Sequence, residues 1–388
     1  MIAATQPVQR PANARLLVVD QNRRFDHVLR ASLVEYLHAG DLVVANDAAT
    51  LPASLQGVHV PTGKSIEVRL AGRPSLRPEE MSCFSAVVFG AGDFHTRTED
   101  RLPPPQLAAG DEIFFGTPLE CGDLSPLWDR SCHGLARSES GDLSPHSKVS
   151  LRATIERILG HERLVLLRFA GTPDHVWAGL AHHGKPIQYA HLQEPLALWD
   201  VWTRIAGPPV AFEPPSAGFA LDWQVLAQLR ARKIEFETIT HAAGISSTGD
   251  QDLDRLLPLD EPYRIPEVTA RVIQQTKERG GHVVAIGTTV VRALESAAID
   301  DGQVRAGDGV ATGRIGPTTR LRIVDAILSG THERGTSHYE LLRAFVDEPT
   351  LTQACIELDE REYLTHEFGD SVLIERSSLA PNTTGDAS

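Results

Sequence analysis

The stretch His282–Ala298, HVVAIGTTVVRALESAA, decides the fold of this chain. It begins with a short apolar run, Val283–Ile286, which predicts a buried β-strand. Gly287 and two threonines interrupt the run, and from Val290 onward the apolar residues fall at helical spacing. A strand, a tight turn and a helix in this order are typical of an α/β domain.

The start of this predicted helix is a candidate ligand site. Backbone N–H groups in a first helical turn lack partners within the helix, and the helix dipole adds partial positive charge there. Thr288 or Thr289 is expected to cap the helix and still offer a hydroxyl to a ligand. Arg292 and Glu295 project near the same edge, which suits an anion or a nucleoside. Equally, Arg292 pairs on the helix surface with Glu295 or Glu278, and the turn binds nothing.

Length and composition indicate a globular protein of more than one domain. A chain of 388 residues is long for one compact core, so two domains are expected. Its 41% hydrophobic and 23% charged residues are ordinary for such proteins. No apolar run approaches the roughly 20 residues of a membrane span. The first residues also lack the apolar core of a signal peptide. We therefore expect a cytoplasmic protein without membrane contact.

Cysteine usage and net charge narrow the function classes. The four cysteines lie far apart, which favours reduced thiols over a disulfide framework and gives no paired metal spacing. The formal net charge of −14 disfavours a broad basic surface. Binding to nucleic acid would then require a local basic patch.

Periodicity divides the chain into an outer α/β domain and an inserted β domain. Residues 1–60 and 186–388 are expected to form one discontinuous α/β large domain, in which apolar runs predict strands and helical spacing predicts helices. Residues 61–185 contain short strands separated by turns, which predicts an inserted small β-barrel domain. The predicted strands of the insert are Ile66–Leu70, Val87–Phe89, Ile113–Phe115, Ala153–Ile158, Leu164–Phe169 and His175–Leu180.

Several elements are predicted in the outer domain. Its expected strands are Arg15–Asp20, Leu42–Ala45, Glu235–Thr240 and the strand-like run Leu321–Leu328, and its expected helices are Ser32–Leu37, Trp223–Ala231, Pro266–Lys277 and Tyr339–Phe345. The polar segment Gly116–Ser150 contains GDLSP twice and is expected to be a long loop, in which His133 and His146 are solvated. The last residues, Ser377–Ser388, are expected to form a polar tail.

Polar residues follow several predicted strands of the outer domain. Asn46 and Asp47 come after one strand, His241 after a second and His332 after a third. Open α/β sheets bind ligands at the carboxyl ends of their strands, so these side chains suggest a nucleoside pocket. Such residues are also common turn formers and caps, and both interpretations stay open.

Several motifs occur in the order known from one enzyme family. Its G-T-T-S-V-R-T-L-E-S resembles Gly287–Ser296, and its P-G-D-L-L-V-x-N-D-T-x-V-I-P-A-R-L resembles Ala39–Leu55. Its P-T-A-G-L-H-F, E-x-Y-x-v-P and Y-G-D-a-M-L-I are similar to Pro215–Leu221, Glu261–Pro266 and Phe368–Ile374. The chain thus resembles the S-adenosylmethionine:tRNA ribosyltransferase-isomerases of queuosine synthesis.

This resemblance implies a fold and a reaction. The fold is an α/β large domain with an inserted β-barrel, in agreement with the periodicity. The implied reaction transfers and isomerises the ribosyl part of S-adenosylmethionine onto 7-aminomethyl-7-deazaguanine in tRNA, releasing adenine and methionine and leaving epoxyqueuosine. It requires a base for a proton beside the sulfonium and groups that hold the departing fragments. S-adenosylmethionine is a substrate, tRNA a possible partner, no metal is expected, and a monomer is favoured.

Departures from the family motifs cluster at the predicted strand ends. H-x-G-x-G-T-F becomes His241–Ser247, which keeps the histidine and loses G-T-F, and M-H-S-E-Y-Y becomes Pro258–Tyr263 without its histidine. D-T-R becomes Asp47-Ala48-Ala49. F-H-L-P-K-S-T becomes Thr331–Ser337, in which the lysine is missing and Arg334 is a candidate substitute. The losses indicate a family scaffold with a changed site.

The candidate site combines these observations. The candidate catalytic residues are His241, His332 and Asp47. The candidate substrate-binding residues are Asn46, Gly218, Ser246, Glu261, Tyr263, Gly287, Thr288, Thr289, Arg292, Glu295 and Arg334. Tyr263 either stacks on a base or lies in the core. Three functions remain open: an enzyme of this family, a paralogue that uses S-adenosylmethionine or a related nucleoside with an acceptor other than tRNA, and a non-catalytic nucleoside-binding protein.

Overall fold

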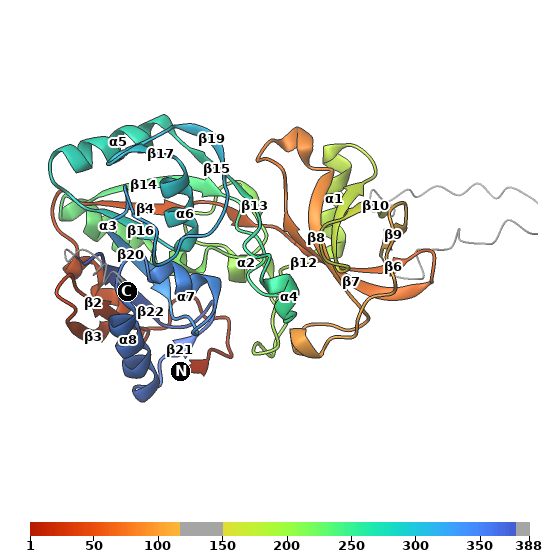
Figure 1. Ribbon diagram of the computed structural model, residues 1–388, viewed down its shortest axis with the longest axis horizontal. Coiled ribbons are helices and arrows are strands. Elements are labelled where there is room, and N and C mark those ends of the chain that lie inside the picture. The colour runs from red at the N-terminus through yellow and green to blue at the C-terminus, as the bar shows by residue number, and fades with distance from the viewer. Residues whose placement is uncertain (117–149, 378–388) are drawn as a thin grey trace, which may run out of the picture.

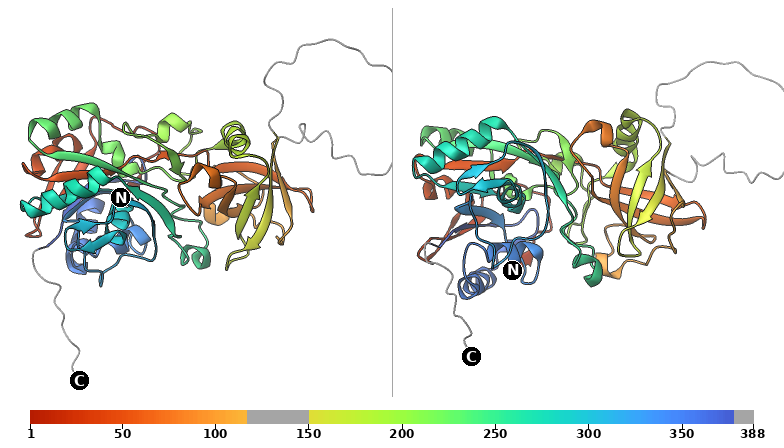
Figure 2. Two further views of the ribbon diagram at one scale, coloured as in Figure 1. Left: turned by 90° about the horizontal axis from the view of Figure 1, so that it is seen from above. Right: turned by 45° about the horizontal axis from the view of Figure 1, so that its top comes forward.

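The structure is a computed structural model that describes residues 1–116 and 150–377, and it places two lobes side by side (Figure 1). One lobe is an α/β domain and the other a β-barrel, as the sequence predicts. Both views of Figure 2 keep the lobes adjacent. The predicted long loop and the predicted tail fall almost wholly outside the described residues, together with His133 and His146.

The α/β lobe is built on a nine-stranded mixed sheet. Its strand order is β19-β15-β14-β4-β16-β20-β22-β2-β3, and β14, β4, β16 and β20 run parallel in its centre. The strands are β2 (Arg15–Val19), β3 (Phe25–Leu29), β4 (Leu42–Asn46), β14 (Glu235–His241), β15 (Glu261–Ile265), β16 (Val283–Ile286), β19 (Gly307–Ala311), β20 (Ala326–Gly330) and β22 (Ser371–Glu375).

Helices cover both faces of this sheet and bury it. The core on one face contains residues of α5 (Glu267–Glu278), α6 (Thr288–Ser296), α7 (Ser337–Leu342) and α8 (Glu348–Glu360). The core on the other face contains residues of the 3-10 helix η1 (Arg30–Tyr36) and of α3 (Trp223–Ala231). All four residues of β16 are buried, which explains its uninterrupted apolar run.

The second lobe is a closed antiparallel barrel. Its strands follow the order β6 (Ser54–His59), β7 (Lys64–Gly72), β8 (Cys83–Phe89), β11 (Leu164–Phe169), β10 (Leu151–Ile158) and β9 (Glu112–Phe115). Pairing of β6 with β9 closes the barrel, and β12 (Gly184–Lys185) lies beside β6. The barrel sheet thus begins at Ser54, before the expected boundary at residue 60.

Smaller elements complete the lobes. They are β1 (Ile2–Ala3), β5 (Ala49–Thr50), β13 (Pro209–Ala211), β17 (Ala298–Asp300), β18 (Gln303–Val304), β21 (Leu364–Thr365), α1 (Pro173–His183), α2 (Leu198–Val201), α4 (Gln251–Asp254), and the 3-10 helices η2 (Pro78–Glu80), η3 (Thr98–Asp100) and η5 (Ser216–Ala220). Within the described ranges, no helix is both long and apolar enough to cross a membrane.

Three predicted elements were wrong in type or extent. His175–Leu180 is not a strand but part of α1, in which Thr172 caps the helix and Pro173 occupies its first position. The expected helix Ser32–Leu37 is a 3-10 helix, η1, that runs from Arg30 to Tyr36. The strand-like run from Leu321 is a strand only from Ala326 onward.

A shared apolar cluster joins the two lobes. It combines barrel side chains, including Phe89, with side chains of the segment that follows β14, including Leu253. Both side chains are fully buried. The segment after His241 is therefore fixed between the lobes rather than free in solvent.

Candidate active site

The four parallel strands in the centre of the large sheet end at one edge. In the register, Ile239 lies beside Asn46, and Ile286 lies beside both Ala45 and Leu328. The segments after β14, β4, β16 and β20 therefore start next to one another. The strands thus end side by side as expected, and the nucleoside pocket suggested at this edge stays a prediction.

The first turn of α6 lies at this edge, and a glycine rather than a threonine precedes it. Gly287 is the N-cap with φ +93°, and no side chain caps the helix there. The expected threonine cap was wrong, and Thr288 is instead the first helical residue. A positive φ favours glycine at this position. The Gly287 N–H donates to the Leu328 carbonyl at 2.8 Å. The N–H groups of the first helical turn have no partner within the helix.

Glu213, which is not among the residues predicted from the sequence, places a carboxyl group at this edge. It follows β13 and accepts hydrogen bonds from the hydroxyls of Tyr189 and Ser246. Burial raises the pKa of Glu213 to about 7, against the smaller opposing effect of those hydrogen bonds. Burial also raises the pKa of the Tyr189 hydroxyl. A carboxyl group that titrates near neutrality is suited to general acid–base chemistry.

His332 and His338 form a stacked pair near the end of β20. Their ring centroids are 4.7 Å apart, and the Ser329 hydroxyl lies 2.7 Å from His332 Nε2. Burial, and then Arg292, lowers the pKa of His338 to about 4. Burial, and then His338, keeps the pKa of His332 well below its ordinary value. Both imidazoles are therefore neutral at pH 7 and can exchange hydrogen bonds without carrying charge.

The Glu367 carboxylate interacts electrostatically with both Glu213 and the histidine pair. His191 Nε2 lies 3.2 Å from the Glu367 carboxylate, and its ring stacks on His366 with centroids 4.1 Å apart. Burial has the largest effect on the pKa values of Glu213 and His338, and the Glu367 charge adds a smaller upward contribution to both. Because Coulomb interactions fade with distance, these groups form one electrostatically connected cluster.

His241, the last residue of β14, is fully buried. Burial, and then Arg292, lowers its pKa to about 3, so the ring is neutral although Nε2 is 3.4 Å from a Glu261 oxygen. Neither ring nitrogen has a hydrogen-bond partner among the described residues. Arg292 pairs with Glu261 and donates to the Ala311 carbonyl at 3.1 Å. Of the two alternatives for Arg292, the surface pair with Glu295 or Glu278 was wrong.

Asn46 ends β4 and Asp47 follows it, and their side chains bond to different residues of β14. The Asn46 amide accepts from the His241 N–H and donates to the His241 carbonyl, both at 2.9 Å. The Asp47 carboxylate accepts from Thr240 at 2.6 Å and Thr238 at 3.1 Å. Asp47 is therefore not brought onto the face that carries His241.

Other candidate residues make contacts away from the cluster. Glu295 accepts three backbone N–H groups of residues 322–324, at 2.8–3.0 Å. Arg334 faces α8 and donates to the Thr352 carbonyl at 3.4 Å. Tyr263 is 6% exposed and belongs to the core. Gly218 is buried in η5, where an added Cβ would lie 3.0 Å from Thr203.

Comparison with known proteins identifies the family. A model of the queuosine biosynthesis protein family matches residues 1–374. This chain belongs to that family. The resemblance stated from the motifs is thereby confirmed.

Curated members of the queuosine biosynthesis family match over nearly their whole length. The S-adenosylmethionine:tRNA ribosyltransferase-isomerase of Sorangium cellulosum is 31% identical, covering 96% of this chain and 95% of that protein. The protein of the same name from Citrifermentans bemidjiense is 28% identical over 96% of each chain. The crystal structure of S-adenosylmethionine tRNA ribosyltransferase from Thermotoga maritima is 21% identical, with a TM-score of 0.46 over 96% of both chains.

Within this member of the queuosine biosynthesis family, the missed groups share one property. Glu213, Tyr189, His191, His338 and Glu367 come from segments outside the predicted strand ends. Glu213 had the only local signal, a carboxylate placed between a strand and two prolines. Local sequence patterns therefore mark the edge of the sheet but only part of the chemistry assembled there.

Proposed function

We propose that this chain is an S-adenosylmethionine:tRNA ribosyltransferase-isomerase. It would transfer the ribosyl part of S-adenosylmethionine to 7-aminomethyl-7-deazaguanine in tRNA and isomerise it, leaving epoxyqueuosine. Membership of the family and the names of the full-length relatives support this activity. The structural feature that carries it is the half-buried Glu213 carboxyl group at the carboxyl edge of the sheet, where burial raises its pKa to about 7.

Each part of the cluster has a proposed role. Glu213 removes the proton beside the sulfonium, since its carboxylate is available at neutral pH and loses little solvation on reacting. The N–H groups in the first turn of α6 bind an anionic group of the substrate, such as the methionine carboxylate. The neutral rings of His332 and His338 hydrogen-bond the departing adenine. His241 acts as a positioning residue at the end of β14.

The test is a direct assay of the purified protein. S-adenosylmethionine and tRNA that carries 7-aminomethyl-7-deazaguanine are incubated with it, and the digested nucleosides are analysed by mass spectrometry. We expect epoxyqueuosine, together with equal amounts of released adenine and methionine. Absence of epoxyqueuosine from an enzyme that binds S-adenosylmethionine would reject the proposal.

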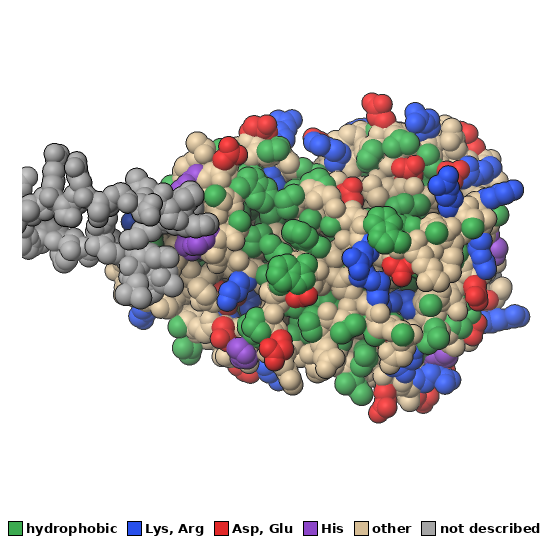
Figure 3. Space-filling model, turned by 180° about the vertical axis from the view of Figure 1, so that it is seen from behind, with side chains coloured by type: hydrophobic (Ala, Val, Ile, Leu, Met, Phe, Trp, Pro, Cys, Tyr) green, Lys and Arg blue, Asp and Glu red, His purple; other side chains and the backbone are tan. Residues whose placement is uncertain are grey.

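A second candidate differs only in the acceptor. The net charge of −14 and the position of Arg334 against α8 favour an acceptor other than tRNA. On the face shown in Figure 3, Lys and Arg side chains are interspersed with acidic ones rather than gathered in one field. Release of adenine and methionine without modification of the tRNA, in the presence of small amine acceptors, would support this candidate.

A further inference from the structure

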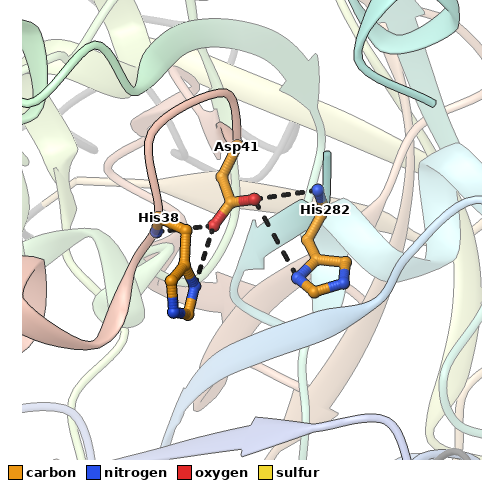
Figure 4. A group of neighbouring side chains, drawn as sticks. All are labelled: His38, Asp41 and His282. Atoms are coloured by element: carbon orange, nitrogen blue, oxygen red, sulfur yellow. Dashed lines mark hydrogen bonds and ion pairs between the residues drawn. The ribbon is translucent and has the colours of Figure 1, made fainter. Parts of the chain in front are cut away.

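The opposite edge of the large sheet has a separate cluster of metal-ligating side chains. His38 lies just after η1, Asp41 directly precedes β4, and His282 directly precedes β16 (Figure 4). Their ligand atoms all lie within 4.8 Å of one another. The cluster lies at the amino ends of β4 and β16, whereas the candidate active site lies at the carboxyl ends.

The Asp41 carboxylate is fixed in place at the centre of this cluster. One oxygen accepts the His38 backbone N–H at 2.8 Å, and the other accepts the His282 backbone N–H at 2.9 Å. The side chain is only 6% exposed. Each carboxylate oxygen can accept a second interaction, so both retain capacity to bind a cation.

The two histidine rings lie on either side of this carboxylate. His38 Nδ1 is 3.7 Å from one Asp41 oxygen, and His282 Nδ1 is 3.9 Å from the other. Neighbouring ligand atoms around a tetrahedral ion are about 3.3 Å apart, since each lies about 2.0 Å from it. The rings are 74% and 57% exposed, so small rotations are free to close the difference.

The backbone segments that hold these ligands are already fastened together. The Leu42 N–H donates to the His282 carbonyl at 2.9 Å, and Arg279 donates to the Gly40 carbonyl at 3.1 Å. A metal ion at this place would join two segments whose spacing does not need to change. Such pre-organisation lowers the cost of binding.

The surroundings of the cluster leave room for a further ligand, and among the described residues they place no lysine or arginine beside Asp41. A cavity of about 190 Å³ adjoins the three residues and gives water access to them. In the described part of the chain, no Lys or Arg lies within ion-pair distance of Asp41. The nearby carboxylate of Asp325 is paired with Lys277 and Arg376, so those cations are already engaged.

We propose that His38, Asp41 and His282 bind one divalent transition-metal ion of the zinc class, with water from the cavity as a further ligand. Imidazole nitrogens select zinc-like ions over magnesium and calcium, which prefer oxygen ligands. The bound ion bridges the segments before β4 and β16 and stabilises the amino edge of the sheet. It takes no part in the proposed ribosyl transfer, which occurs at the other edge.

The test measures zinc bound to the full-length protein. Chelator-treated wild type, His38→Ala, His282→Ala and the double variant are dialysed against Zn²⁺ and analysed by elemental mass spectrometry. His95→Ala is the matched control, because His95 is an exposed histidine 3.0 Å from a single carboxylate, Asp93. We expect the double variant to bind one equivalent less than wild type, and the control variant to bind the same as wild type.

Comparing the variants separates zinc bound at this site from zinc bound by other histidines and cysteines of the chain. Zn²⁺ should also raise the melting temperature of the wild type by a few degrees and leave that of the double variant unchanged, since only a folded site binds. Both rings are largely exposed, so the variants should keep the wild-type circular dichroism spectrum. Equal zinc content in all the proteins, or an equal thermal shift in the double variant, would overturn the proposal.

Discussion

At the scale of single residues, the chemistry of Glu213 depends on what buries it. If Glu213 is the base, kcat/KM must rise with pH through about 7, where the carboxyl group loses its proton. Glu213→Gln should lower kcat/KM about 10²- to 10⁴-fold, which is the usual contribution of a positioned base. Steady-state assays of both proteins from pH 5.5 to 9 check this.

Tyr189→Phe provides a finer test of the same group. The Tyr189 hydroxyl lowers the Glu213 pKa by donating to its carboxylate, so its removal should move the rise in kcat/KM to higher pH. Tyr36→Phe is the control, since Tyr36 donates to Asp26 near the opposite edge. Coincident pH profiles for Tyr189→Phe and wild type would exclude this coupling.

His241 should make the protein acid-sensitive. Its pKa is about 3 in the folded protein and about 6.5 when unfolded, so below pH 6.5 the unfolded chain binds a proton that the native state refuses. Stability is therefore lost as pH falls through this window, by about 1.4 kcal/mol per pH unit from this residue. Urea unfolding of His241→Leu between pH 6 and 5 should show a slope smaller by that amount. His95→Ala should keep the wild-type slope, and an unchanged slope in His241→Leu would refute the argument.

Which site residues could be predicted depended on their local context. Asn46 and His241 directly follow apolar runs, so their place at the sheet edge could be derived from the sequence. The pKa of Glu213 depends on the packing of Tyr189, Ser246 and Glu367, which are distant in sequence. No local pattern encodes such packing, and the candidate set therefore lacked Glu213.

At the scale of elements, the turn between β16 and α6 requires Gly287. An alanine there would hold φ near +93°, a region that costs about 1–3 kcal/mol for residues with a Cβ. With ψ 158° this is a conformation that almost only glycine adopts, so the first turn of α6 should shift to relieve the strain and activity should fall. The added Cβ itself would make only an ordinary contact, 3.4 Å from Ala217. Gly63→Ala is the control, because Gly63 has φ +66° and nothing within 4 Å of an added Cβ. Urea unfolding should show a larger loss of stability for Gly287→Ala than for Gly63→Ala, and only Gly287→Ala should lose activity. Equal losses of stability, with full activity in both variants, would contradict the requirement for Gly287.

Element type was predicted best where burial is uniform. The fully buried β16 and β4 appear in the sequence as apolar runs. The helix α1 was mistaken for a strand because its Thr172-Pro173 start, a cap followed by a first-turn proline, was treated as a turn. Capping depends on two or three residues, so one misjudged turn changes the predicted type of a whole element.

At the scale of the whole molecule, the apolar cluster between the lobes should couple their unfolding. Leu253→Ala would leave a cavity in this cluster and cost about 2–5 kcal/mol. Because the cluster joins the lobes, calorimetry should then resolve two transitions. Leu229→Ala, in the core between α3 and the sheet, should lower the melting temperature without splitting the transition. One transition in both variants would show that the lobes couple by other contacts.

The insertion could be predicted because hydrophobic periodicity changes along the chain, but its first strand could not. In β6 the polar residues and Gly57 mask the alternation, and an added Cβ at Gly57 would lie 2.8 Å from the Phe114 carbonyl. Barrel closure requires that glycine, and this requirement appears only when β9 lies across from it.

The short pairing of β12 with β6 brings the two ends of the barrel segment together. Ser54, where the chain enters the barrel, lies opposite Lys185, where the chain leaves it. Partners across a ladder are about 5 Å apart, so a linker of two or three residues would bridge the gap. The barrel therefore leaves and re-enters the host domain at one place, as an inserted domain does, and its removal would expose the apolar cluster around Leu253.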